Sequence, residues 1–341
     1  MNKPLVTINL VVNNGEKYLR YCLDHVRRQT YENLEVNVFD NASIDSTRDI
    51  VQREYPEFNL IAHPQNLGMW PGQEEALKSS HGFYIVGLSV DVMMHPQFVK
   101  NAIRVCEADP LIGALQAKIL RYDFQQLADG SYDASKIIDT CGFRLARSRR
   151  VMNVGHGAFD YGQHDQATEI FAAEGAVPFF KKEALEAIRI DGAIVDHDYF
   201  WYGDDLDLTW RMQLFGWKQW YDPDVIAYHD RSTTKGHSRS MMDYFRRVKT
   251  RQQIPIRKRI LDWSNVRFTI IKNDYIINIL KDAPYIAIRE IQVLGFALLF
   301  EPQIFLEIPR FLGLLPAMLR KRRLVMAKAK KSPQEMHTWF I

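Results

Sequence analysis

The chain has 341 residues, 47% of them hydrophobic and 25% charged, which is an ordinary balance for a globular protein with a substantial core. This length suits one large α/β domain with an appendage, or two modest domains. Its three cysteines, Cys22, Cys106 and Cys141, are too far apart for a disulfide framework or a zinc site, which indicates a reducing compartment. No apolar leader precedes the first strand-like segment, so we expect no export.

The net charge of +3 conceals an uneven distribution along the chain. Residues 1–230 contain 22 Lys and Arg against 33 Asp and Glu, whereas residues 231–341 contain 22 against 8. A basic final third on an acidic body favours an anionic partner for that third, either a membrane surface or a nucleic acid. The alternative is a basic face that is merely solvated.

Short apolar runs alternate with helix-like stretches over about the first 120 residues, a pattern that predicts βαβ units and a mostly parallel sheet. The expected strands are 5–12, 34–39, 59–62, 83–88 and 112–119, and the expected helices are 16–29, 70–78 and 96–107. Residues 121–166 show no regular pattern. The elements expected after them are a strand at 176–180, helices at 182–188 and 205–215, and a short strand that ends near His229.

The composition shifts after His229. Residues 239–260 are rich in Arg and Lys, and residues 263–320 contain apolar clusters that Glu and Pro interrupt. No uninterrupted apolar run reaches the roughly 18–20 residues that a membrane-spanning helix needs. We therefore expect helices that lie at a membrane interface or pack tightly, rather than a span.

Acidic side chains follow two of the predicted parallel strands, at the edge of the sheet where ligands bind in open α/β folds. Asp40 follows the second strand and Asp91 the fourth. Such a carboxylate could accept a hydrogen bond from a base or ribose, or bind a divalent cation beside substrate phosphates. For Asp40 the alternative is a helix N-cap.

A third group of acids, Asp204, Asp205 and Asp207, lies within four positions. Carboxylates this close repel one another unless a cation or a proton-transfer role compensates. Asp205 stands at a predicted helix start, where it could act as a general base toward a hydroxyl group. The surrounding aromatic residues favour a pocket over a solvated acidic cap. His229, at a predicted strand end further along, is a candidate metal ligand.

These groups lie within a series of motifs whose order and spacing are characteristic. The motifs are Val6 to Glu16, Gln29 to Val36, Phe39 to Thr47, Asn66-Leu67-Gly68, Leu88 to Asp91, Gly175 to Leu185, Tyr202 to Arg211, and Pro223 to His229. Together they resemble the family 2 glycosyltransferases over about residues 5–230, and within that family the rhamnosyltransferase-like branch. The chain departs from the family pattern at Ser89, where Asn or Asp is usual, and at Asn13, where Tyr is common.

The resemblance implies a GT-A-type α/β fold with a mostly parallel central sheet flanked by helices and a C-terminal helical extension. The catalytic domain would span residues 1–235, with a donor half at about 1–120 and an acceptor half at about 121–235. Residues 236–341 would form the basic amphipathic helical region.

The resemblance also implies the chemistry, an inverting transfer of a sugar, with rhamnose the first candidate. The donor would be a dTDP or UDP sugar, the acceptor a glycan or a lipid-linked glycan, and the cofactor Mg²⁺ or Mn²⁺. Asp205 would be the base, and Asp204 would orient the acceptor or the metal shell. The other implied roles are donor binding by Asn13, Asp40, Asn66, Gly68 and Asp91, metal binding by Asp91 and His229, and acceptor contacts by Trp70, Gly175, Trp201 and Tyr202.

Three alternatives stay open. A nucleotidyltransferase would also use an Asp after a strand and a metal, but its glycine-rich phosphate loop is missing. A catalytically impaired binding protein of the same fold is the second, supported only by Ser89. Nucleic-acid binding through the tail is the third, and no such motif is found there. We expect no nucleic-acid partner and place the protein at the cytoplasmic face of the membrane, unless the tail packs on the body or forms a homo-oligomer interface.

Overall fold

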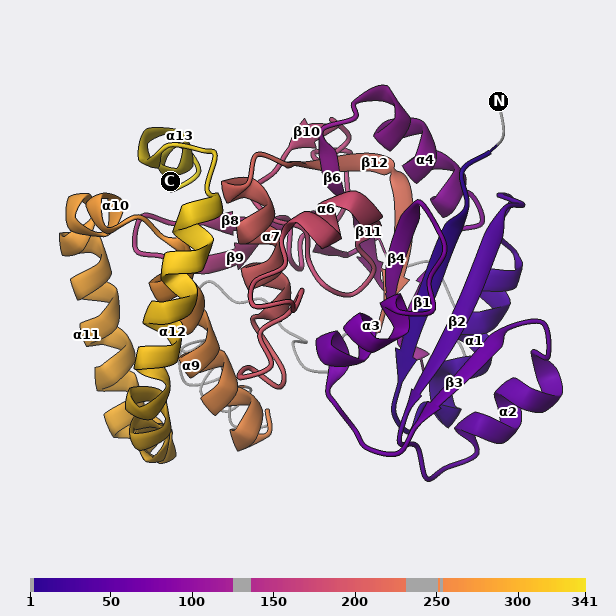
Figure 1. Cartoon of the computed structure of the whole chain (residues 1–341), viewed down its shortest axis with the longest axis horizontal. Helices are drawn as coiled ribbons and strands as arrows, with labels where there is room; N and C mark the ends of the chain where they lie inside the picture. Colours follow the sequence, from indigo (N-terminus) through magenta and orange to yellow (C-terminus); the bar gives the residue numbers. More distant parts are fainter. Residues whose placement is uncertain (1–2, 125–135, 231–250, 252–253) are drawn as a thin grey trace.

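The structure, a computed structural model, describes residues 3–124, 136–230, 251 and 254–341 (Figure 1). Strands and helices alternate in its first third. They are β1 (Val6–Val12), α1 (Glu16–Arg27), β2 (Leu34–Asn41), α2 (Thr47–Glu54), β3 (Asn59–His63), α3 (Met69–Leu77), β4 (Tyr84–Ser89), β5 (Val92–Met94), α4 (Phe98–Ala108) and β6 (Ile112–Arg121).

Shorter elements follow. They are β7 (Ile138–Thr140), β8 (Phe143–Leu145), β9 (Val151–Asn153), β10 (Thr168–Glu169), β11 (Phe179–Lys181), α6 (Lys182–Ala187), α7 (Asp204–Leu214) and β12 (Lys218–His229). The chain closes with α9 (Ile256–Asn273), α10 (Ile276–Lys281), α11 (Ala283–Phe300), η1 (Pro302–Glu307), α12 (Ile308–Lys328) and α13 (Pro333–His337).

The described strands form a ten-stranded sheet and a separate β8-β9 hairpin. The main order is β10-β12-β6-β11-β4-β1-β2-β3, with β5 paired to β12 and β7 to β6. The part β4-β1-β2-β3 is wholly parallel, as the alternating pattern predicts. Every residue of β1 is buried, which is expected of a parallel strand covered on both faces.

The other part of the sheet is mixed rather than parallel. The short strand β11 runs antiparallel to both β4 and β6 and joins the two halves. β12 is parallel to β6 and has a register shift between Asp222 and Ile226. The prediction of a short strand before His229 was wrong, because β12 has 12 residues. Its charged and Pro-containing middle hides the apolar pattern of the strand.

Helix α7, which carries the acid cluster, connects the sheet to the C-terminal helices. Ten of its eleven residues are buried. Helix α9 packs on α7 and on α12, with a buried stripe that includes Leu261, Asn265 and Phe268. In Figure 1 the C-terminal helices lie at the end of the molecule opposite β2 and β3, and α7 lies between.

Helix α11 is largely exposed although it is apolar. Within the described part of the chain it is the one helix whose length and composition would let it cross a membrane, and only 6% of it is buried. Arg289 and Glu290 interrupt its apolar sequence. The predicted basic run at 239–260 lies partly outside the described residues, since only 251 and 254–260 of it are described.

Candidate active site

A cleft of about 630 Å³ lies where the parallel sheet, α7 and α9 meet. Eight of the predicted site residues line it, and they come from five separate parts of the chain. These residues are Trp70, Asp91, Gly175, Trp201, Tyr202, Asp204, Asp205 and His229. The residues predicted for the metal, the base and the acceptor side therefore lie around one cavity.

Asp91 and His229 lie side by side at the sheet edge because β12 pairs with β5, which follows Asp91. The His229 Nε2 atom is 3.4 Å from an Asp91 carboxylate oxygen. The other imidazole nitrogen, Nδ1, is 2.9 Å from Asp139 Oδ2. Ser89, the departure from the family pattern, donates a hydrogen bond of 2.6 Å to Asp91, so it orients the carboxylate.

These contacts make a strongly polarised pair. Burial lowers the pKa of the His229 imidazole, but the carboxylates of Asp91 and Asp139 raise it to about 10. Burial raises the pKa of the Asp91 carboxyl, and the charge of His229 together with hydrogen bonds from His229 and Ser89 lowers it to about 2. The site thus favours a positive charge next to Asp91.

The same residues fit a divalent cation. A carboxylate oxygen and an imidazole nitrogen 3.4 Å apart are spaced much as two adjacent ligands of one ion would be. Asp139 fixes the ring of His229 from behind, which is how carboxylates support metal-binding histidines. Among the described residues no group of three or more His, Cys, Asp or Glu side chains could hold a metal, so other ligands would have to complete the shell.

Asp205 lies in the first turn of α7, where the helix dipole favours an anion. Its Oδ2 accepts a hydrogen bond of 3.1 Å from the backbone N–H of Gly175. A Cβ at residue 175 would lie 3.0 Å from both the Asp205 Cβ and Oδ2 and 3.2 Å from Trp70 Nε1. Glycine at 175 therefore lets this turn of the chain approach the carboxylate closely.

Asp204 differs from its neighbour although both line the cleft. It is 2% exposed, and neither of its carboxyl oxygens has a hydrogen-bond partner in the described part of the chain. Burial, and then the charges of Asp205 and Asp207, raise the pKa of Asp204 well above its usual range. This carboxyl therefore favours its neutral form.

Four predicted donor-binding residues lie outside the lining of this cleft and form their own network. Asn13 donates to the carbonyl of Asn41 at 2.8 Å, and Asn66 accepts from Asn41 at 3.1 Å and from the Gly68 N–H at 2.9 Å. Asp40 is fully buried, accepts from the Ser43 N–H and pairs with Arg48. The carboxylate oxygens of Asp40 therefore hold the local turn, which is close to the N-cap role given above as the alternative. A contact between Asp40 and a nucleobase stays a prediction.

Several residues that line the cleft, or that support its lining, were not predicted from the sequence. Asp139 lies in the segment where no element could be assigned, and only the fold brings it to His229. Helix α9 and the residues before it contribute Arg251, Lys258 and Arg259. Glu301 pairs with both arginines, at 2.9 and 2.8 Å. The charge run predicted this positive character, but not its place beside the acids.

The chain is similar to known proteins over part of its length. Residues 7–168 match the model of the family described as Glycosyl transferase family 2. The chondroitin synthase of Escherichia coli is 33% identical over 106 residues, which are 30% of this chain and 15% of that protein. The glycosyltransferase GlyA of Streptococcus pneumoniae serotype 4 is 30% identical over 99 residues, 28% of this chain and 14% of that protein. In the first curated relatives the match spans less than a third of their length.

Solved structures define the fold. The crystal structure of GalNAc-T7 with UDP, GalNAc and Mn²⁺ is 14% identical with a TM-score of 0.55, and the match covers 73% of this chain and 48% of that one. S. aureus TarS is 13% identical with a TM-score of 0.50, covering 80% and 50%. The chain therefore has the GT-A-type glycosyltransferase fold. The family match makes residues 7–168 similar to the family 2 glycosyltransferases.

Proposed function

We propose that the protein is an inverting glycosyltransferase that moves a sugar from a nucleoside diphosphate to an acceptor hydroxyl. The observation that carries this proposal is a shared cleft, in which a carboxylate at a helix start, Asp205, faces the same cavity as the pair Asp91–His229. The family match over residues 7–168 supports it from an independent direction.

In the proposed mechanism Asp205 accepts the proton of the acceptor hydroxyl as that oxygen attacks the anomeric carbon. The Gly175 N–H holds the Asp205 carboxylate at 3.1 Å. Asp91 and His229 Nε2 would hold Mg²⁺ or Mn²⁺, which would act as a Lewis acid on the leaving diphosphate. One displacement inverts the configuration, and no enzyme nucleophile is required.

The finer assignments rest on the family resemblance. The donor is a dTDP or UDP sugar with rhamnose as the first candidate, and the acceptor is a glycan or a lipid-linked glycan. Trp201, which is 41% exposed, and the adjacent ring of Tyr202 offer aromatic surface to an acceptor sugar.

Attachment to the inner face of the cell membrane is part of the same proposal. Large exposed apolar side chains cluster on α11 and α12, including Ile288, Ile291, Leu298 and Leu312. Exposed basic residues, Arg310, Arg320, Arg323 and Lys328, lie on α12. Apolar burial in the headgroup region, together with about 1 kcal/mol from each basic residue near an anionic leaflet, would hold the enzyme there.

The test of the activity is a donor screen with purified full-length protein, Mg²⁺ or Mn²⁺, and glycan and lipid-linked acceptors. We expect acceptor-dependent release of a nucleoside diphosphate from one donor class. Release of pyrophosphate would instead identify a nucleotidyltransferase, and no release with any donor would favour a binding protein. If only UDP-hexoses served as donors, rhamnose would be excluded.

The test of attachment uses substitutions rather than truncation, because the C-terminal region includes α9, which packs on α7. The triple variant Ile288→Ser, Ile291→Ser and Leu298→Ser should lose binding to anionic vesicles, and high salt should weaken binding of the unaltered protein. The matched control is Ile44→Ser with Leu111→Ser, two exposed apolar positions far from α11 in the sequence. Equal vesicle binding by both variants would refute the attachment.

A further inference from the structure

The chain between Tyr199 and Gly203 forms a strained turn directly before the acid cluster; we refer to residues 199–203 as the acceptor loop. Phe200, Tyr202 and Gly203 all have positive φ angles, of 64°, 66° and 82°. The Trp201 N–H donates to the Tyr199 carbonyl at 2.8 Å, which closes a γ-turn around Phe200. A bulky residue with positive φ is rare and costly, and it persists only where surrounding contacts fix it.

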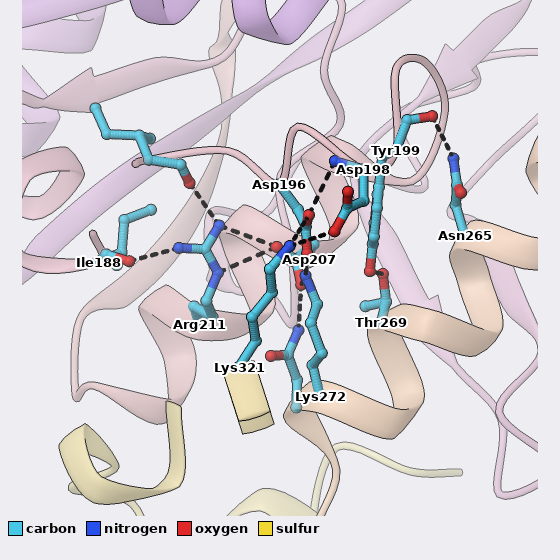
Figure 2. Close-up of polar contacts among 12 residues, drawn as sticks. Ile188, Asp196, Asp198, Tyr199, Asp207, Arg211, Asn265, Thr269, Lys272 and Lys321 are labelled. Atoms are coloured by element: carbon cyan, nitrogen blue, oxygen red, sulfur yellow. Dashed lines mark hydrogen bonds and ion pairs between the residues drawn. The ribbon is translucent and has the colours of Figure 1, made fainter. Parts of the chain in front are cut away.

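Those contacts come from Asn265, more than sixty residues later in helix α9. Its amide nitrogen lies 3.2, 2.8 and 2.7 Å from the carbonyl oxygens of Tyr199, Trp201 and Tyr202. Asn265 is fully buried. One turn along α9, the hydroxyl of Thr269 is 3.0 Å from that of Tyr199. Figure 2 shows Asn265 and Thr269 reaching the two ends of Tyr199.

A second set of buried contacts fixes both flanks of the acceptor loop. Lys272 of α9 is 2.6 Å from Asp196, before the loop, and 2.9 Å from Asp207, after it. Lys321 of α12 also pairs with Asp196 and lies 2.7 Å from Asp198. Figure 2 shows the two lysines converging on these acids from different helices. The flanks of the loop are thus tied to elements outside the segment that the family model matches.

From these contacts we infer that Asn265 is a positioning residue for the proposed transfer, acting through the acceptor loop on Asp205 and on the aromatic face of Trp201 and Tyr202. This inference rests on the proposed function for its catalytic part. Helices α9 and α12 are then part of what shapes the acceptor side of the cleft, in addition to any membrane contact.

Asn265→Ala removes the side-chain amide that contacts three backbone carbonyls of the acceptor loop, so the loop should leave its strained conformation. Because small misplacements of reacting groups are costly, we expect turnover to fall about 10²-fold, with affinity for nucleoside diphosphate within about twofold. Asn265→Ser keeps one hydrogen-bond donor, so its turnover should lie between that of the unaltered protein and that of Asn265→Ala. If Asn265→Ala does not fold, Asn265→Ser supplies the comparison.

The matched control is Asn278→Ala, which also removes a buried amide that donates to a backbone carbonyl, that of Pro333 at 2.8 Å. It should cost comparable stability without a loss of turnover. Hydrogen exchange of the amides of residues 199–203, measured on the full chain, provides a readout that needs no substrate. We expect faster exchange there in Asn265→Ala and Asn265→Ser but not in Asn278→Ala.

The outcomes separate the two proposals. Unchanged exchange in the acceptor loop of Asn265→Ala would overturn the positioning role. So would turnover reduced only as much as in Asn278→Ala. If the unaltered protein transfers no sugar from any donor while exchange in the loop still depends on Asn265, then the proposed function fails and the structural part of the inference stands.

Discussion

The two sides of the cleft are built by different means. On the proposed donor side, Asp91 and His229 lie at the ends of neighbouring strands, and the backbone pairing of β12 with β5 brings them together. On the proposed acceptor side, Asp205 follows a turn with positive φ angles that side chains of α9 and α12 hold in place. The donor side therefore depends on sheet geometry, and the acceptor side depends on buried polar contacts between distant segments. Substitutions on the two sides should therefore change different measured properties of the protein.

The largest effect is expected from Asp205→Asn, which removes the proposed base and keeps the side-chain shape. Loss of a general base costs about 10²–10⁴ in rate, whereas the donor is bound through other groups. Turnover should collapse while nucleoside diphosphate affinity, measured by calorimetry, stays near that of the unaltered protein. A variant with full turnover would eliminate Asp205 as the base.

Asp196→Asn tests the polar contacts of the acceptor side through stability. Burial raises the pKa of Asp196, but Lys272 and Lys321 lower it well below its usual value. A carboxyl with a lowered pKa stabilises the fold above its unfolded pKa of about 3.9, and this contribution is lost as the pH falls through the folded pKa. Breaking a buried ion pair costs about 3–5 kcal/mol. Urea unfolding near pH 7 should therefore show a free energy of unfolding that is much lower in Asp196→Asn than in the unaltered protein.

The matched control for Asp196 is Asp198→Asn, because Asp198 also pairs with Lys321 but is partly exposed. It should cost at most about 1 kcal/mol, as surface pairs do. The difference between Asp196→Asn and the unaltered protein should shrink below about pH 4. If that difference has the same size at low and neutral pH, the ion pairs are not what Asp196 contributes.

The donor side is tested through its metal. We expect activity to require a divalent cation, and Asp91→Ala and His229→Ala to weaken the dependence on it. Asp139→Asn, which weakens the support behind His229 and also the contacts of Asp139 with Arg121 and His156, should lower the apparent metal affinity about 10–100-fold. The apparent metal affinity of each of the three variants would be measured by titrating its activity with Mn²⁺. Activity that survives a strong chelator would contradict the proposed site.

The smallest effect is expected from Asp204→Asn, one position before the proposed base. Burial, and then the charges of Asp205 and Asp207, raise the pKa of Asp204 well above its usual range. Its carboxyl therefore favours the neutral form, and an amide is a neutral replacement of similar shape. Turnover should fall only by roughly severalfold, far less than the loss expected for removal of a base. A loss as large as that of Asp205→Asn would show that Asp204 works as a charged group.

The sequence predicted the parallel strands within a few residues, because a buried strand has a local signal in its continuous apolar run. It could not predict β7 to β10, which have two or three residues each and no measurable period. The antiparallel insertion of β11 also escaped prediction, since strand pairing is decided by contacts between distant segments.

The candidate site shows the same division. Asp91, Asp205 and His229 stood out because each follows or begins a regular element in a family motif. Asp139 and Asn265 carry no local signal, since one lies in an irregular segment and the other is a neutral residue in a basic helix. Their importance arises from partners 90 and more than 60 residues away.

The turn at Gly68 affects whether the predicted donor half of this chain could be combined with the acceptor half of another protein. Gly68 has a φ angle of 92°, and a Cβ there would lie 2.2 Å from the carbonyl oxygen of Phe200. The predicted donor half and the acceptor loop thus meet backbone to backbone, with no side chain between them to absorb a mismatch. A chimera that joins this donor half to the acceptor half of another enzyme would need a glycine at the first position and a matching turn at the second. The turn at Gly68 and the acceptor loop would have to be taken from the same protein, even though more than a hundred residues separate them in the chain.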